Sequence, residues 1–279
     1  MIVVGSEFRD NGLVQAIGRL RYLEAMPRLG VRKRGTLLLI HAFPVTARMF
    51  EAQLALSEHG WRVVAPQLRQ FDHTDNDPAA TSLDDFAGDV VDLLDALHIE
   101  EAVIGGVSMG GYIAFAMFRR APRYFQGLLL ADTKSEADTA EAVAGRLRML
   151  QLVRDKGPAA VADDMIPKLL GRTTRATQPE VVERVRALVL SSSSDAIAGA
   201  IGALMTRPDS GPLLSSIRCP TLVAVGEEDT VTPRSAAEAM HRAIAGSELV
   251  TIPQAGHLAN LEQPAAFNAA LARFLEHRL

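Results

Sequence analysis

Short, continuous runs of apolar residues recur along the chain, and such runs are typical of strands that are covered on both faces. Between most of these runs lie segments of helical length whose apolar residues recur at helical spacing. The alternation predicts a parallel sheet with helices on both faces, an α/β fold. The predicted strands are Leu37–Ile40, Val63–Ala65, Ala102–Ile104, Leu128–Leu130, Thr221–Val225 and Leu249–Ile252.

The predicted helix that starts at Ser82 has a capping signal at its N-terminus as well as an apolar face. Ser82 is followed three residues later by Asp85, which resembles a capping box with Asp in place of Glu. The apolar residues that follow recur at helical spacing; they are Phe86, Val90, Leu93, Leu94 and Leu97.

The alternation fails between about Lys134 and Leu213, where no run is typical of a strand. We interpret residues 134–213 as a helical cap, or lid, inserted into a core made of residues 1–133 and 214–279. A plain helical extension of the core is the alternative. The predicted helices are Ala142–Val153, Ala159–Leu170, Pro179–Leu190 and Asp195–Met205.

The sharpest chemical signal is the segment Gly106–Gly111, which fits G-x-S-x-G around Ser108. It follows a predicted strand and precedes a predicted helix, which is the context that a nucleophile elbow requires. Glycines two positions before and after Ser108 leave room for backbone to pass close by. One alternative is a glycine-rich turn without chemistry. The segment does not fit a phosphate loop, which would need lysine before the serine. It also does not match the dinucleotide fingerprint G-x-G-x-x-G in the proper register.

A serine nucleophile needs a base, usually histidine, that a carboxylate orients. His257 is the histidine that sits beside glycine in a loop just after a late predicted strand. Glu227, Glu228 and Asp229 all follow the strand Thr221–Val225 and are all candidates for the acid. Asp229 lies farthest past the strand end, and the order Ser108, Asp229, His257 is that of α/β-hydrolase triads. Asp132, after another strand, is an alternative acid.

Acyl transfer also needs N–H donors aimed at the developing oxyanion. We expect one from Met109, next to the nucleophile, and one from Phe43, in the loop after the strand Leu37–Ile40. His41 lies in the same loop, and we interpret it as shaping the loop rather than transferring protons.

Composition excludes several classes of protein. The net charge of −4 among 279 residues gives no basic field for nucleic acid or an anionic membrane. The one cysteine, Cys219, rules out an intramolecular disulfide and a cysteine cluster for a metal. The N-terminus carries no export signal, and no apolar run is long enough to span a membrane. These features predict a cytoplasmic protein that acts on a small molecule.

Four motifs together resemble the α/β-hydrolase superfamily from about Leu37 to Leu279. They are His41-Ala42-Phe43-Pro44, the elbow around Ser108, the acid turn Gly226–Asp229 and the segment Ala255–Pro264. The chain is also similar to small esterases, enol-lactonases and cofactor-free haloperoxidases. The resemblance implies an eight-stranded, mostly parallel sheet with a helical cap after the sixth strand. The N-terminal segments Leu13–Ile17 and Leu20–Leu23 are then candidates for antiparallel strands.

The chain departs from the family pattern in two loops. Ala42 stands where glycine is usual, which affects the oxyanion loop. The stretch Gln67–His73 lacks both glycines of the usual D-L-R-G-x-G loop. Phe71, Asp72 and His73 then either line the pocket or cover the surface.

These observations predict a serine hydrolase that cleaves small carboxylic esters or lactones through an acyl-enzyme, with no metal and no organic cofactor. A perhydrolase or cofactor-free haloperoxidase would use the same residues. A non-catalytic ligand-binding protein and a lyase are the alternatives from other classes.

Overall fold

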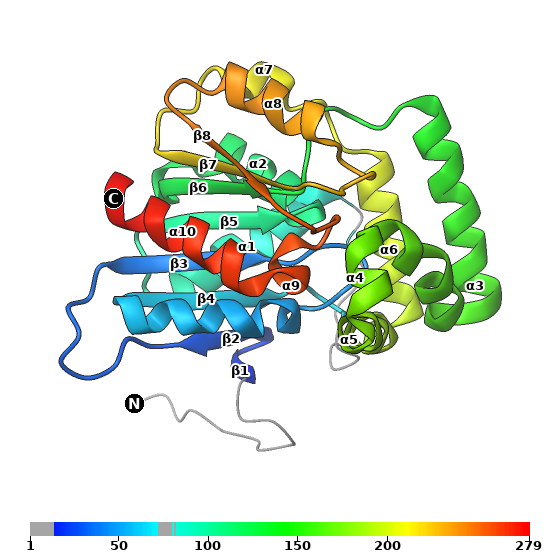
Figure 1. Cartoon of the computed structure of the whole chain (residues 1–279), viewed down its shortest axis with the longest axis horizontal. Coiled ribbons are helices and arrows are strands. Elements are labelled where there is room, and N and C mark those ends of the chain that lie inside the picture. Colours follow the sequence, from blue (N-terminus) through cyan, green and yellow to red (C-terminus); the bar gives the residue numbers. More distant parts are fainter. Residues whose placement is uncertain (1–13, 72–79, 81) are drawn as a thin grey trace.

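The computed structural model describes residues 14–71, 80 and 82–279, and these residues form an eight-stranded sheet (Figure 1). The strand order is β1-β2-β4-β3-β5-β6-β7-β8; β1 and β2 pair antiparallel, β2 pairs antiparallel with β4, and the remaining pairs are parallel. The predicted fold class is confirmed. The strands are β1 (Val14–Ile17), β2 (Leu20–Ala25), β3 (Gly35–Ile40), β4 (Trp61–Gln67), β5 (Ala102–Val107), β6 (Phe125–Ala131), β7 (Thr221–Gly226) and β8 (Glu248–Ile252).

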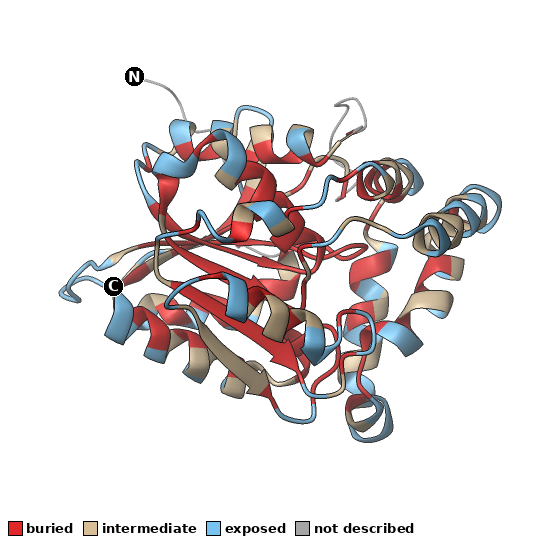
Figure 2. Cartoon of the chain, turned by 90° about the horizontal axis from the view of Figure 1, so that it is seen from above, coloured by how far each residue is buried: buried red, intermediate tan, exposed pale blue. Residues whose placement is uncertain are grey.

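Five of the six continuous apolar runs are buried strands, which Figure 2 shows in red, whereas Leu249–Ile252 belongs to the edge strand β8, where all residues but Ile252 are only half-buried. Every residue of β5 and of β7 is buried, because helices cover both faces of the sheet there. The N-terminal candidates match the antiparallel pair β1 and β2, except that Leu13 lies outside the described residues.

Helices cover the two faces of the sheet in separate groups (Figure 1). The 3-10 helix η1 packs against α9 and α10, whereas α1 packs against α2. The capping box at Ser82 is formed, since its hydroxyl accepts the Asp85 N–H and the Asp85 carboxylate accepts the Ser82 N–H. These helices and their neighbours are η1 (Ala47–His59), α1 (Leu83–Ala96), α2 (Met109–Arg120), η2 (Pro122–Tyr124), α8 (Arg234–Ala243), α9 (Ala259–Glu262) and α10 (Pro264–Arg278).

Residues 134–213, which we call the helical insertion, form helices between β6 and β7. The two predicted helices before Leu170 are α3, which is broken at Gly157, where the backbone has φ +72° and ψ −173°. The helices are α3 (Ala140–Leu169), α4 (Arg172–Thr177), α5 (Pro179–Leu190), α6 (Ser194–Met205) and α7 (Gly211–Leu214), the last of which continues into the core.

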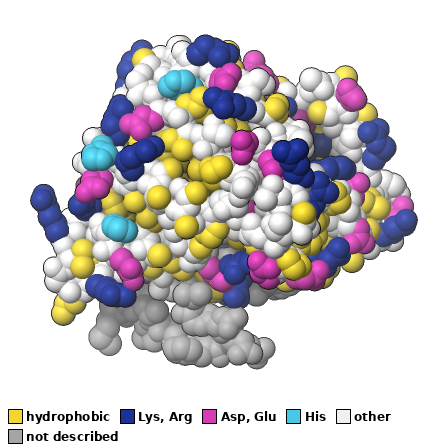
Figure 3. Space-filling view, in the orientation of Figure 1, with side chains coloured by type: hydrophobic (Ala, Val, Ile, Leu, Met, Phe, Trp, Pro, Cys, Tyr) yellow, Lys and Arg dark blue, Asp and Glu magenta, His cyan; other side chains and the backbone are white. Residues whose placement is uncertain are grey.

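No single helix of the described residues has the length and apolar character to cross a membrane. Only α5 and α6 taken together would meet both criteria, and the two helices are bent by 92° at their junction. On the face shown in Figure 3, positive and negative side chains are interspersed.

The order β3-β5-β6-β7-β8 is one continuous parallel block. The loops that follow its strands therefore emerge at the same edge of the sheet, where α/β proteins bind their ligands. Every predicted site residue follows one of these strands.

Candidate active site

Ser108 forms the turn between β5 and α2 in a strained conformation. Its backbone has φ +53° and ψ −113°, a region that residues other than glycine rarely adopt. Two hydrogen bonds hold the turn: the Ser108 N–H donates to the Ala131 carbonyl at 2.9 Å, and the Thr133 hydroxyl donates to the Ser108 carbonyl at 2.8 Å. This is the strand–turn–helix geometry of a nucleophile elbow.

The glycines around Ser108 allow backbone segments to touch. A Cβ atom on Gly106 would lie 2.1 Å from the Gly110 carbonyl carbon, and one on Gly110 would lie 2.0 Å from the Ile40 carbonyl oxygen. Both distances are far below van der Waals contact, so this tight turn requires glycine at both positions. The second contact also places the turn directly beside the end of β3.

A line of hydrogen bonds joins Ser108 to two residues from distant parts of the chain. His257 Nε2 lies 2.7 Å from Ser108 Oγ, and His257 Nδ1 lies 2.8 Å from Asp229 Oδ2. His257 and Asp229 are 1% and 6% exposed, and Ser108 is 9% exposed. The structure thus brings together the three residues that the sequence selected as nucleophile, base and acid.

Asp229 is held by its own turn as well as by His257. Its Oδ1 accepts the N–H groups of Val231 and Thr232 at 2.8 and 3.0 Å, and its Oδ2 accepts the Thr232 hydroxyl at 2.6 Å. Burial acts to raise the pKa of Asp229, but the neighbouring His257 and these hydrogen bonds outweigh burial, so the pKa lies below its usual value. Asp229 is therefore the carboxylate suited to orient the imidazole.

The other candidate acids have different partners. Glu227 accepts the Gln254 N–H at 3.0 Å, and Glu228 accepts the Thr173 N–H at 2.9 Å. Asp132 accepts the N–H groups of Gly226 and Ala259 at 2.7 and 3.2 Å. Burial, with repulsion from Asp229, raises the pKa of Asp132 well above its usual value.

Both predicted oxyanion donors border the Ser108 turn. Met109 is the first residue of α2, and the first N–H groups of a helix have no partner within it. Phe43 lies in the turn after β3, which touches the elbow through Gly110. In that turn the Ala42 N–H contacts the Met49 sulfur at 3.3 Å.

His41 is fully buried and engaged at both ring nitrogens. Its Nε2 accepts the Leu68 N–H at 3.2 Å, and its Nδ1 lies 3.0 Å from the Ala42 carbonyl oxygen. Burial lowers the pKa of His41 to about 4. The neutral ring therefore ties the turn after β3 to the loop after β4, in agreement with a role in shaping the loop.

The altered loop that begins at Gln67 is described only as far as Phe71. That ring is fully buried and packs edge-on against His41, with 4.9 Å between ring centroids. Asp72 and His73 lie outside the described residues.

Two residues that hold Asp229 and the His257 loop in place were not predicted from the sequence. Thr232, which bonds Asp229, also lies 3.2 Å from His257 Nδ1 through its hydroxyl. Its position three residues after the acid was the signal that could have found it. Glu262, which belongs to the segment compared with the family, is 1% exposed and accepts hydrogen bonds from N–H groups on both sides of His257.

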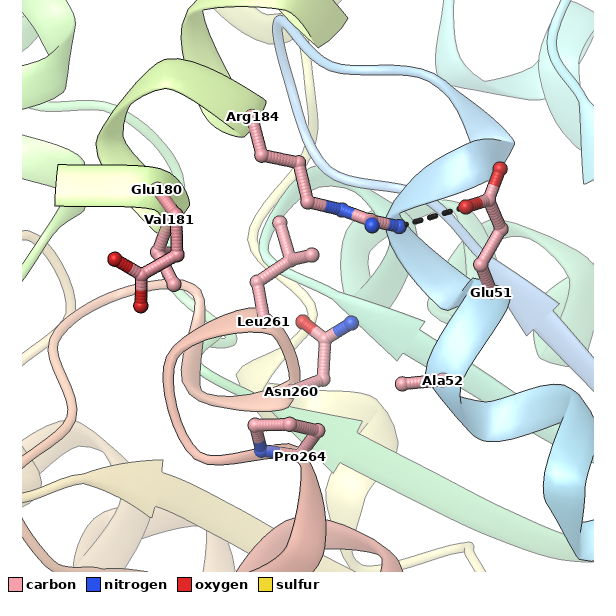
Figure 4. A pocket seen from close by; sticks show the side chains of 8 residues that line it. All are labelled: Glu51, Ala52, Glu180, Val181, Arg184, Asn260, Leu261 and Pro264. Atoms are coloured by element: carbon pink, nitrogen blue, oxygen red, sulfur yellow. Dashed lines mark hydrogen bonds and ion pairs between the residues drawn. The ribbon is translucent and has the colours of Figure 1, made fainter. Parts of the chain in front are cut away.

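A surface pocket of about 510 Å³, which none of the three hydrogen-bonded residues lines, lies between η1, α5, α9 and the start of α10 (Figure 4). An ion pair of 2.9 Å from Arg184 to Glu51 spans it. The pocket is lined by Glu51, Ala52, Glu180, Val181, Arg184, Asn260, Leu261 and Pro264.

Among the described residues, no three His, Cys, Asp or Glu side chains are grouped so that they could hold a metal ion.

Residues 35–264 match the family model of the alpha/beta hydrolase fold, so the chain belongs to the α/β-hydrolase family. The resemblance drawn from the sequence motifs is confirmed.

Named relatives define the enzyme class more closely. The chain is 28% identical to 3-oxoadipate enol-lactonase 2 of Acinetobacter baylyi, over 87% of this chain and 89% of the relative. A thermophilic esterase from Thermogutta terrifontis, solved with malate bound, shares 36% identity and a TM-score of 0.85 over 92% of this chain and 93% of the esterase. The enol-lactonase of Burkholderia xenovorans shares 25% identity and a TM-score of 0.84 over 95% of this chain and 100% of its own. At the level of class, the prediction of a carboxylesterase-type hydrolase is confirmed.

Proposed function

We propose that this chain hydrolyses small carboxylic esters or lactones through a covalent acyl-enzyme on Ser108. The observation that carries the proposal is the hydrogen-bonded line from Asp229 through His257 to Ser108, which ends at a strained elbow. The esterase and enol-lactonase relatives support the same substrate class.

In the first half of the reaction, His257 Nε2 takes the proton from Ser108 Oγ as this oxygen attacks the carbonyl carbon. Asp229 holds the Nδ1–H tautomer of His257 and stabilises the imidazolium. The N–H groups of Phe43 and Met109 bind the tetrahedral oxyanion, and each such donor is typically worth about 3–4 kcal/mol. The imidazolium then protonates the leaving oxygen, and the bond between that oxygen and the acyl carbon breaks.

In the second half, His257 takes a proton from water, whose oxygen attacks the acyl carbon. The second tetrahedral intermediate collapses when the bond to Ser108 Oγ breaks and the imidazolium returns the proton to Ser108. The carboxylic acid leaves, and no redox step and no organic cofactor are required.

We assign the helical insertion the role of a lid over a core of residues 1–133 and 214–279. Most of its apolar side chains make core contacts, and those that face the site would favour substrates with uncharged acyl groups. Leu169, Leu170 and Leu204 are fully buried, whereas four further side chains are half-buried against the core: Met149, Leu150, Met165 and Met205.

The test of the nucleophile is Ser108→Ala, assayed with p-nitrophenyl acetate and butyrate. We expect turnover to fall on the order of 10⁶-fold, as for loss of a serine nucleophile in a protease. A fluorophosphonate should add its mass to the wild-type peptide that contains Ser108, and not to the variant. A variant that keeps most of the wild-type rate would refute the mechanism.

The preference for uncharged acyl groups is tested separately. A series of p-nitrophenyl esters of increasing chain length is compared with a lactone that bears a carboxylate. We expect higher kcat/KM for the neutral esters; a strong preference for the charged lactone contradicts the acyl-group assignment but leaves the serine mechanism intact.

A further inference from the structure

One buried carboxylate, that of Glu262, accepts hydrogen bonds from the loop that carries His257. Glu262 Oε1 accepts the N–H of Gly256 at 2.9 Å and the N–H of Leu258 at 3.2 Å, so it holds the residues on both sides of His257. Glu262 Oε2 accepts the Gly171 N–H at 2.8 Å. One carboxylate therefore bridges the His257 loop and a turn of the helical insertion.

The same turn contacts His257 directly. Between α3 and α4, the Leu169 carbonyl accepts the backbone N–H of His257 at 2.9 Å. The two backbones are also in van der Waals contact, because a Cβ atom on Gly256 would lie 2.3 Å from the Gly171 nitrogen, and one on Gly171 would lie 2.9 Å from the Gly256 nitrogen. The insertion thus supplies part of the support on which the histidine sits.

Glu262 is 1% exposed, and burial raises its pKa despite the hydrogen bonds that it accepts. A buried carboxylate is costly unless its oxygens are hydrogen-bonded. These oxygens accept hydrogen bonds from backbone N–H groups of two segments that lie about 90 residues apart in sequence, and interaction with the Thr174 side chain also favours the charged form of Glu262. This arrangement fixes the position of a loop rather than contacting a substrate.

We propose that Glu262 is a positioning residue: it joins the Leu169–Gly171 turn of the insertion to the His257 loop and thereby aligns the imidazole with Ser108. The proposal rests on the proposed function, since it concerns the base of that mechanism. A displacement of about 1 Å in a reacting group can cost on the order of 100-fold in rate.

Glu262→Gln tests the bridge with little change in shape. A carboxamide has one acceptor oxygen, so its NH2 group must face either the Gly171 N–H or the two N–H groups beside His257. On one side of the bridge, the NH2 group then faces a backbone N–H group, so that side loses its hydrogen bond. We expect kcat for p-nitrophenyl butyrate to fall about 10- to 100-fold while KM stays within about twofold.

Gly171→Ala approaches the same contact from the insertion, because its methyl group would lie 2.6 Å from Glu228 Oε2, 2.9 Å from the Gly256 nitrogen and 3.2 Å from Glu262 Oε2. We expect the same split between kcat and KM, and we expect the double variant to lose less than the product of the two single losses, because both changes break one bridge. Near-UV circular dichroism identifies the folded variants. The kcat and KM of either folded variant then decide whether the bridge positions His257.

Glu51→Gln is the matched control. Glu51 also joins the insertion to the core, through its 2.9 Å ion pair with Arg184, but it contacts neither the Leu169–Gly171 turn nor the His257 loop. We expect its kcat to stay within about twofold of the wild type. An equal loss in Glu51→Gln would mean that general loosening of the insertion matters, and it would overturn the specific role of Glu262.

Three outcomes separate this proposal from the one on which it rests. If Ser108→Ala is inactive and Glu262→Gln keeps the wild-type kcat, the positioning role is wrong and the serine mechanism stands. If Glu262→Gln raises KM with kcat unchanged, the residue acts on substrate binding, which also overturns positioning. If Ser108→Ala remains active, the proposed function itself fails.

Discussion

Two buried carboxyl groups lie near the His257 loop, and their partners predict different consequences when each is replaced by an amide. Asp229 contacts the imidazole, whereas Asp132 accepts N–H groups of Gly226 and Ala259. We expect Asp229→Asn to lower kcat about 10⁴-fold, the size of the corresponding change in a serine protease. Asp132→Asn keeps one acceptor oxygen and should lose at least 100-fold less. Steady-state ester hydrolysis decides, and a larger loss in Asp132→Asn would reverse the assignment of the acid.

His41 predicts a dependence of stability on pH. Its pKa is about 4 in the folded chain because of burial and about 6.5 when unfolded, so below pH 6.5 the unfolded state binds the proton more readily. Its contribution to the free energy of unfolding is therefore complete above about pH 6.5 and is lost as the pH falls toward 4.

The measurement compares the wild type with His41→Gln by urea unfolding at several pH values. Relative to the variant, the wild type should lose about 3 kcal/mol between pH 7.5 and pH 4. If the free energy of unfolding depends on pH in the same way for both proteins, the His41 ring is not neutralised by its burial.

At the scale of elements, local pattern accounts for most of what the sequence predicted. The central strands are continuous apolar runs, and α5 has the bounds that its helical spacing predicted. The two helices expected before Leu170 meet at Gly157, whose positive φ breaks α3. By contrast, η1 was not predicted, because its buried positions mix apolar residues with Gln53 and give no continuous apolar face.

The candidate site, like the elements, was predicted only in part. Ser108, Asp229 and His257 could be selected because each follows a predicted strand and parallel strands end at one edge. The roles of Glu262 and of the Leu169 carbonyl could not be predicted, because they depend on which backbone N–H groups a folded chain leaves without partners. Such pairings join residues about 90 positions apart and leave no periodic trace in sequence.

The elbow gives a prediction about an element rather than about a reacting group. A methyl group on Gly110 would meet the Ile40 carbonyl at 2.0 Å, so α2 must move away from β3 in Gly110→Ala. We expect a loss of about 3 kcal/mol in unfolding free energy or more, together with lower activity, because Met109 shifts with the helix.

Gly202→Ala is the matched control for that substitution. Gly202 lies in α6, and beyond the backbone of its own helix no heavy atom comes within 4 Å of the place that an alanine methyl group would take. Alanine should therefore stabilise this helix by about 0.5–1 kcal/mol. Chemical unfolding of both variants measures the contrast. Equal effects would show that close backbone contact does not limit the elbow.

At the scale of the whole molecule, the helical insertion is bonded to several loops at the active edge of the sheet. Ser192 donates to the Pro44 carbonyl at 3.1 Å, next to the predicted oxyanion donor Phe43. Thr173 donates to Glu228, beside Asp229. With the His257 contacts, these bonds tie the loops that carry Phe43, Asp229 and His257 to the insertion.

The two ends of the insertion meet in a buried ion pair. Asp138, near its start, accepts from Arg207, near its end, at 2.8 Å, and the two side chains are 2% and 3% exposed. The Arg207 guanidinium also lies over the Tyr112 ring, 4.3 Å from its centroid, and thus rests on α2 of the core. Asp138 also pairs with Arg146 at 2.5 Å. We expect Asp138→Asn to cost about 3–5 kcal/mol, because it removes the counter-charge of the buried Arg207 guanidinium and breaks the pair with Arg146.

The single tryptophan, Trp61, separates two explanations for such a loss. It is buried in β4, so its fluorescence reports unfolding of the sheet, whereas far-UV circular dichroism reports all helices, including those of the insertion. Since the insertion is bonded to the loops of the core, we expect both signals of Asp138→Asn to shift together to one lower midpoint. The exposed pair Arg186–Asp163 provides the control, and Asp163→Asn should cost less than about 1 kcal/mol. Helical signal lost before the Trp61 transition would instead mean that the insertion unfolds alone and that its contacts do not couple it to the sheet.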